Sequence, residues 1–196
     1  MARVGKIERK TKETAISLVL NLDGEGKADL NLPVPFMVHM LDLFARHGRF
    51  DLMAEARGDT CIDDHHTVED LGICLGKALK EALGNKGGIE RFGCAYVPMD
   101  EALVRTVLDL SGRPYLNFQV EFTQEKVGSF DLELIEEFLR AFANQSGTTL
   151  HITCLAGKNN HHMAEAIFKS LGRSLRDAVK ITDLKGNIPS TKGSLE

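Results

Sequence analysis

An internal repeat narrows the possible folds of this chain more than any other feature. Residues 65–82 and 161–178 align at an offset of 96 residues with 7 identities in 18 positions. Unrelated helices of ordinary composition would give roughly one identity. The first copies of the identical residues are His65, His66, Glu69, Leu75, Gly76, Leu79 and Ala82. A repeat of about half the chain predicts two similar halves, residues 1–90 and 91–185, in one compact unit with a tail at 186–196.

Hydrophobic periodicity predicts the same kinds of element in both halves. The first half offers strands at 14–22 and 27–32, joined as a hairpin by the turn DGEG, then a helix at 35–48, a strand at 50–58 and a helix at 64–83. The second half offers strands at 91–98, 102–110 and 114–122, a helix at 130–147, a strand at 148–156 and a helix at 161–179. Sheets with helices on one face, an α+β fold, are expected.

Composition excludes several classes of function. The chain has 196 residues, 43% of them hydrophobic and 27% charged, with a formal net charge of −4 and no basic tract for nucleic acid. No apolar run is long enough for a membrane span and no signal peptide is evident, so a cytoplasmic protein is expected. The four cysteines form no CxxC pair, which argues against a thiolate zinc site or a disulfide framework.

The repeated motif HHxxE predicts metal binding. On a helix, His65 and Glu69 lie on one face, as do His161 and Glu165, so each pair can chelate an ion. The neighbouring His66 points about 100° away and should serve a different ion, as should His162. Imidazole with carboxylate suits Mn, Fe, Ni or Zn. A solvent-exposed helix turn explains one such copy equally well, but two copies with matched glutamates poorly.

Single residues outside the motif have plainer explanations. His39, alone on an apolar helix, reads as a packed side chain, and His47 as a cation at a helix C-terminus. Glu13 reads as a solvated residue at a strand entrance. The segment PSTKG at 189–193 suits a phosphate group. The basic residues Arg91, Arg113, Lys169 and Lys192 read as ordinary surface charge.

Longer stretches resemble a known family. They are LDGEGK, HMLDLFARHG, DDHHTVEDLGICLGKAL, RFG…PMDEA, LDLSGRPYL and GKNNHHMAEAIFKSLGRSL. With the doubled HHxxE they closely resemble the monofunctional imidazoleglycerol-phosphate dehydratase family of histidine biosynthesis, over nearly the whole chain. The resemblance implies that each half is a four-stranded sheet covered by two helices. It also implies two Mn²⁺ per subunit and trimers that assemble into 24 subunits.

The implied reaction removes water from imidazole-glycerol phosphate and yields imidazole-acetol phosphate. Expulsion of hydroxide needs an electron-rich ring, and two metal ions would stabilise the imidazolate that leads to a diazafulvene. A binuclear metal phosphoester hydrolase is the alternative enzyme. A metal-binding structural or storage assembly is the non-catalytic alternative, although it has no use for a phosphate clamp.

The resemblance also assigns residues. It makes His39, His65, His66, Glu69, His161, His162 and Glu165 metal ligands. Where the family usually has a further histidine, this chain has Glu137, the repeat partner of His39, which we expect to ligate as a carboxylate. The phosphate group is assigned to Arg91, Arg113, Lys169, Ser190 and Lys192. Glu13, Glu165, His47 and Asp100 are the candidates for catalytic and proton-transfer roles near the substrate.

Overall fold

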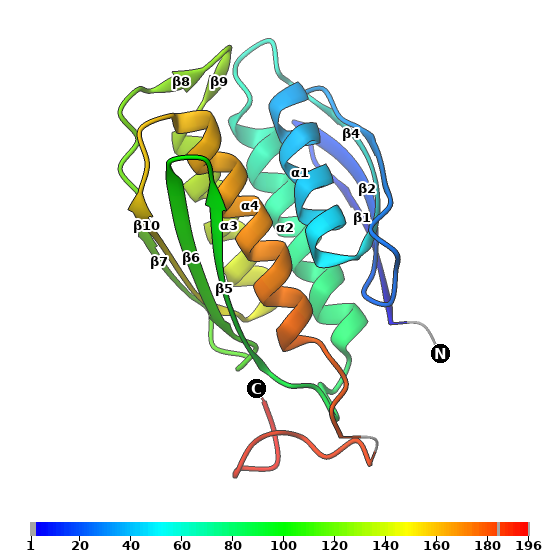
Figure 1. Cartoon of the computed structure of the whole chain (residues 1–196). Helices are drawn as coiled ribbons and strands as arrows, with labels where there is room; N and C mark the ends of the chain where they lie inside the picture. The colour runs from blue at the N-terminus through cyan, green and yellow to red at the C-terminus, as the bar shows by residue number, and fades with distance from the viewer. Residues whose placement is uncertain (1–2, 184, 196) are drawn as a thin grey trace.

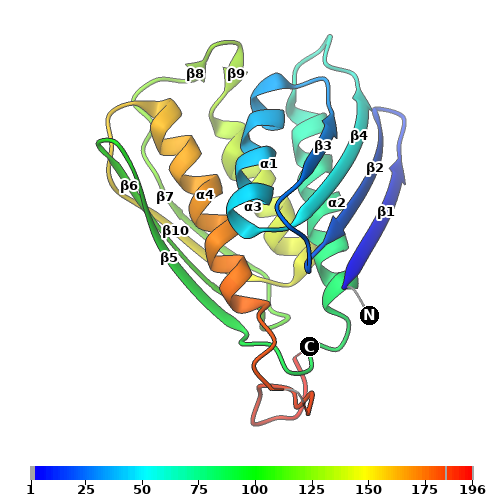
Figure 2. The same ribbon diagram turned by 45° about the vertical axis from the view of Figure 1, so that its right-hand side comes forward.

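In the part of the chain that the structure describes, two four-stranded sheets enclose four helices (Figures 1 and 2). The structure, a computed structural model, describes residues 3–183 and 185–195. In Figure 2 one sheet lies on each side, the helices fill the space between them, and the C-terminal segment extends beyond one end of the molecule. Each helix therefore packs with one face against a sheet and with another face against a neighbouring helix.

The first half contains β1 (Val4–Lys10), β2 (Thr14–Asn21), β3 (Ala28–Asn31), α1 (Pro35–Gly48), β4 (Asp51–Gly58) and α2 (His65–Leu83). Its sheet has the order β1-β2-β4-β3. Strand β2 is antiparallel to both of its neighbours, β1 and β4, and β3 runs parallel to β4. Helices α1 and α2 lie on one face of this sheet (Figure 2).

The second half repeats this arrangement with β5 (Phe92–Met99), β6 (Ala102–Asp109), β7 (Tyr115–Gln119), α3 (Glu133–Ser146), β10 (Thr149–Ala156) and α4 (Asn160–Ala178). The sheet order is β5-β6-β10-β7, again with a parallel final pair. A two-stranded hairpin, β8 (Lys126–Val127) and β9 (Phe130–Asp131), is added before α3. The predicted α+β class and the duplication are confirmed.

The predicted hairpin at DGEG is wrong. Strand β4 lies between β2 and β3, so the two predicted partners do not pair. Asp51 Oδ1 at the start of β4 accepts hydrogen bonds from the backbone N–H of Glu25 (2.9 Å) and Lys27 (3.1 Å). These bonds shape the loop into a crossover that places β3 beyond β4. Strand β1, which was not predicted, occupies the outer position beside β2 instead.

Close backbone contacts show how the repeat is built. A Cβ on Gly5 would meet the carbonyl oxygen of Ala78 at 2.0 Å, and one on Gly93 would meet that of Ser174 at 1.9 Å. Each first strand therefore touches its long helix at equivalent points. The equivalent strand positions, Gly5 and Gly93, are 93 − 5 = 88 residues apart, whereas the equivalent helix positions, Ala78 and Ser174, are 174 − 78 = 96 residues apart. The offset between the two halves is therefore 88 in these strands and 96 in the long helices.

The helices pair across the two halves. A Cβ on Gly76 of α2 would lie 2.6 Å from the carbonyl oxygen of Phe142 of α3, and one on Gly172 of α4 would lie 2.5 Å from that of Phe44 of α1. Helix α1 thus packs on α4, and α2 on α3. These contacts align α1 with α3 at an offset of 142 − 44 = 98 residues, which makes Glu137 the positional counterpart of His39. No described helix is both long and apolar enough to cross a membrane.

Candidate metal centre and phosphate pocket

Three ligand side chains meet where α1 crosses α4. The Nε2 atoms of His39 and His161 lie 2.9 Å and 3.1 Å from Oε1 of Glu165. All three ligand atoms lie within 4.8 Å of one another, close enough to bind one ion. In residues 3–183 and 185–195, no other set of three His, Cys, Asp or Glu ligand atoms is as close. The expected His161–Glu165 pairing is present, and His39 joins it rather than packing in the core.

Glu165 is held in its charged form. Burial alone raises the pKa of its carboxyl group, but hydrogen bonds from Lys169 and His39 outweigh burial and bring the pKa to about 2. Lys169 Nζ lies 2.6 Å from Oε2 of Glu165, and both side chains are largely buried. The site therefore offers two imidazole nitrogens and an ionised carboxylate, a donor set that suits a divalent ion such as that of Mn, Fe, Ni or Zn.

His47 lies in the last turn of α1, within electrostatic range of Lys169 and Arg173 of α4. Burial lowers the pKa of its imidazole, and the positive charges of Lys169 and Arg173 lower it further. The ring is therefore neutral near pH 7 and able to accept a proton.

The second histidine of the α4 motif is bound to a carboxylate from a different element. Glu101, in the β5–β6 turn, accepts a hydrogen bond from His162 Nδ1 at 2.8 Å through Oε2. Its Oε1 accepts the backbone N–H groups of Lys158 (3.1 Å) and Asn159 (2.7 Å). The bond from His162 and the two backbone bonds lower the pKa of Glu101 to about 2. Asp100 lies next to Glu101, with Oδ2 3.9 Å from His162 Nε2.

The second histidine of the α2 motif has a similar partner. His66 Nδ1 lies 3.0 Å from Oδ2 of Asp59, which follows β4. This bond raises the pKa of His66, and the nearby charge of Glu13 raises it further. Glu13 and Asp59 line the same shallow cavity at the β1–β2 turn.

The remaining predicted ligands lie on α2 and α3. His65 and Glu69 are in the first two turns of α2, which packs on α3, the helix that carries Glu137. Glu137 Oε1 lies 3.8 Å from Nε of Arg140. These side chains do not form a close group like that of α1 and α4 within the part of the chain that the structure describes.

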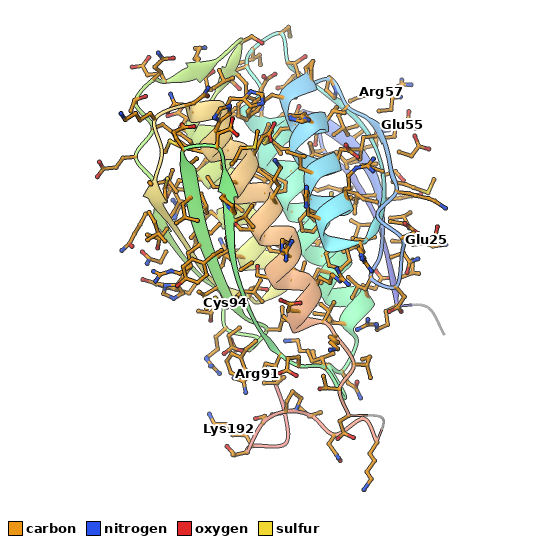
Figure 3. The ribbon with its side chains drawn as sticks, in the orientation of Figure 1. Glu25, Glu55, Arg57, Arg91, Cys94 and Lys192 are labelled. Carbon is orange, nitrogen blue, oxygen red and sulfur yellow. The ribbon has the colours of Figure 1, made fainter. Side chains whose placement is uncertain are left out.

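Four of the five predicted phosphate residues line one cavity of about 670 Å³ at the end of the molecule. They are Arg91, Arg113, Ser190 and Lys192, and Figure 3 shows Arg91 and Lys192 at this end. Arg91 is fixed by Asp109, with Nε 2.7 Å from Oδ1, and by Pro189, whose carbonyl oxygen accepts from Nη1 at 2.8 Å. Arg113 is exposed, with Nη2 3.9 Å from Oδ2 of Asp109. Lys169 is not part of this cavity, because it binds Glu165.

The phosphate cavity and the histidine group lie at opposite ends of α4. Arg91 donates its backbone N–H to the carbonyl oxygen of Ala178, the last residue of α4, whereas His161 is in the first turn. At about 1.5 Å per residue these ends are about 25 Å apart.

Sequence reasoning missed the contacts of Asp59 with His66 and of Glu101 with His162. The strand offset of 88 residues relates Glu13 to Glu101 (101 − 13 = 88), because Gly5 and Gly93 occupy equivalent positions. The 96-residue offset of the HHxxE repeat does not relate these two residues. No sequence signal pairs Asp59 with His66, since Asp59 has no such counterpart.

The fold and the site define a duplicated α+β protein with a histidine–carboxylate centre and a basic cavity suited to an anion. The sequence profile of the imidazoleglycerol-phosphate dehydratase family matches residues 33–175. The chain belongs to this family of hydro-lyases, dehydratases of histidine biosynthesis.

Individual relatives agree with this assignment. The imidazoleglycerol-phosphate dehydratase of Geobacillus kaustophilus is 58% identical over 195 residues and covers 100% of both chains. That of Hydrogenovibrio crunogenus is 59% identical over 194 residues, 98% of this chain and 100% of its own. The crystal structure of the Staphylococcus aureus enzyme superposes with a TM-score of 0.83 at 41% identity, covering 91% of this chain and 99% of that one. The Pyrococcus furiosus structure gives 0.84 at 38% identity, covering 96% and 100%.

Proposed function

We propose that this chain catalyses the manganese-dependent dehydration of imidazole-glycerol phosphate to imidazole-acetol phosphate. The observation that carries the proposal is the meeting of His39, His161 and Glu165 within 4.8 Å, at the motif that is repeated in α2. The family membership supplies the reaction class, the donor set supports a divalent transition-metal ion, and manganese is the ion that the family resemblance implies.

We assign one ion to His39, His161 and Glu165, and a second to donors of the other half. The candidates for completing the two sites are His65, His66, Glu69, Glu137 and His162. Two Mn²⁺ per subunit follow from the duplication. When bound, the metal supplies positive charge that favours loss of the ring N–H proton of the substrate.

The protein's own residues orient the substrate and move its protons. Arg113 and Lys192 bind the phosphate group, while Arg91 shapes the cavity through Asp109 and Pro189. The substrate passes through a diazafulvene, and a proton must leave the carbon next to the site of hydroxide loss. Neutral His47 is a base for that proton, and Glu13, Glu165 and Asp100 are the carboxylate alternatives. Glu165, with a pKa of about 2, is already ionised and engaged with Lys169.

A complete site requires more than one copy of the chain. The histidine group and the phosphate cavity are about 25 Å apart along α4. The substrate, a ring with a three-carbon phosphate chain, spans only about 10 Å. One copy would therefore contribute the metal end and another the phosphate end, which supports a homo-oligomer; trimers and a particle of 24 subunits are the assembly that the family resemblance implies. A cytoplasmic location belongs to the same proposal.

The test is an assay of metal-free protein given imidazole-glycerol phosphate, with and without Mn²⁺, following the ketone product. Product that depends on Mn²⁺ is expected, and a His161→Ala variant should give none. Assembled, manganese-loaded protein without ketone formation would refute the dehydratase. Release of inorganic phosphate from simple esters would favour the binuclear hydrolase instead.

A further inference from the structure

The two histidines that stand second in each HHxxE motif have the same environment. In each case a carboxylate from outside the helix lies at hydrogen-bond distance from Nδ1: Glu101 at 2.8 Å from His162 and Asp59 at 3.0 Å from His66. An ionised carboxylate can only accept a hydrogen bond, so it fixes the proton on Nδ1. The lone pair of Nε2 is then available to a metal ion.

We propose that Glu101 and Asp59 are positioning residues, which hold His162 and His66 in the orientation and tautomer that a metal ion requires. The inference rests on the proposed function, because it takes these two histidines as ligands. Ligating histidines commonly donate their second ring N–H to a carboxylate, and loss of that partner weakens metal binding about 10–100-fold.

The two carboxylates differ in their further contacts. Glu101 also accepts the N–H groups of Lys158 and Asn159, so the β5–β6 turn is tied to the start of α4. Asp59 Oδ1 is buried and has no hydrogen-bond partner among the described residues. An unpaired buried carboxylate oxygen costs free energy, so its retention beside His66 suggests a function beyond packing.

The two halves place a carboxylate beside the second histidine of the motif, but they use residues at non-equivalent positions. By the strand offset of 88, the counterpart of Glu101 is Glu13, yet the carboxylate at Nδ1 of His66 comes from Asp59. Because Asp59 occupies Nδ1 of His66, the Glu13 carboxylate is not needed there and can serve another role. Glu101, by contrast, is committed through both of its oxygens.

The test measures Mn²⁺ affinity of the assembled, full-length protein by calorimetric titration. In Glu101→Gln, the amide oxygen can keep the bonds to Lys158 and Asn159, while the amide nitrogen faces His162. That NH₂ group can only donate, so it moves the ring proton to Nε2 and blocks the lone pair. We expect binding at one class of site to weaken about 10–100-fold, while the metal-free protein remains folded. Asp59→Asn should weaken the other class, and Glu81→Gln, at the far end of α2, should weaken neither.

A double-mutant cycle separates positioning from a general effect of charge. Glu101→Gln should add no further loss of affinity to His162→Gln, because the carboxylate acts through that ring. Additive losses, or wild-type affinity in both Glu101→Gln and Asp59→Asn, would overturn the inference while leaving the proposed function intact. Failure of the wild-type protein to bind Mn²⁺ would overturn both.

Discussion

At the residue scale, Lys169 contacts Glu165 and does not line the cavity of the other residues that the resemblance assigns to the phosphate group. It was assigned to the phosphate group, but its Nζ lies 2.6 Å from Glu165 and 3.3 Å from the sulfur of Met99. A buried carboxylate that loses its ammonium partner is costly, by about 3–5 kcal/mol when it is left alone. Since His39 and His161 remain as partners of Glu165, the cost here should be smaller.

We predict that Lys169→Met lowers the free energy of unfolding of the metal-free protein by about 2 kcal/mol. Chemical denaturation measures this loss, and Lys77→Met, at an exposed position of α2, is the matched control. If Lys169→Met keeps full stability and only raises KM for the phosphorylated substrate, the original assignment to phosphate is right.

The sequence indicates some site residues and not others, for a physical reason. His161 and Glu165 are four residues apart on a helix, so local geometry alone brings them together. Asp59 and Glu101 reach their histidines from loops whose positions depend on the packing of whole sheets. Such contacts leave no local pattern in the sequence. A carboxylate in a turn cannot be recognised from the sequence as having or lacking a histidine partner.

At the element scale, the crossover from β2 to β3 shows that the residues of a turn do not by themselves decide which strands pair. Asp-Gly favours a hairpin, yet the loop is held by Asp51, which lies 26 residues beyond Glu25. The four helices were predicted to within about three residues at their ends, because amphipathic periodicity and terminal glycines are local properties. The parallel pairing of β3 with β4 depends on contacts that no local pattern encodes.

The lowered pKa of Asp51 makes the contribution of this crossover to the stability of the fold depend on pH. The hydrogen bonds from the backbone N–H groups of Glu25 and Lys27 lower the pKa of its carboxyl group. A carboxyl group whose pKa is lower in the folded state stabilises the fold above its unfolded pKa of about 4, and this contribution disappears as the pH falls through the folded pKa. We predict that below about pH 4 the wild-type protein loses stability more steeply than Asp51→Asn, as measured by thermal unfolding at a series of pH values. Asp29→Asn, an exposed change on β3, should follow the wild-type profile.

The glycine contacts between helices make a second prediction at this scale. In Gly172→Ala the new methyl group would lie 2.5 Å from the carbonyl oxygen of Phe44, which is backbone and cannot rotate away. We expect α1 and α4 to separate, at a cost of about 1–3 kcal/mol in the free energy of unfolding. Gly76→Ala should cost a similar amount through Phe142, and Arg173→Ala, on the exposed face of α4, should cost less. Equal stability of Gly172→Ala and the wild type would contradict this account of the packing.

At the scale of the whole molecule, the duplication was visible in the sequence but its consequence was not. Similar halves could each bury their own helices, yet here each short helix packs on the long helix of the other half. This exchange brings His39 to the motif of α4, and by the same symmetry it places Glu137 on the side of α2. The repeat identifies which residues correspond, whereas the choice of partners is made by packing.

The separation of the two ends of α4 leads to a prediction about mixed assemblies. His161→Ala removes a ligand at the metal end, and the double variant Arg113→Ala, Lys192→Ala removes the phosphate contacts at the other end. Each variant alone should be almost inactive. If each site takes its metal end and its phosphate end from different copies, a random 1:1 mixture contains about a quarter of sites with both ends intact, as for independent neighbours in a symmetric oligomer.

Co-expression of the two variants with different affinity tags, followed by purification through both tags, provides the mixed particles. We expect them to recover about a quarter of the wild-type rate, and each variant purified alone supplies the baseline. Chains that complete their sites by themselves would give no recovery, because every copy in the mixture has one damaged end. Activity in the mixture therefore measures directly whether the 25 Å between the histidine group and the phosphate cavity is bridged by a second copy.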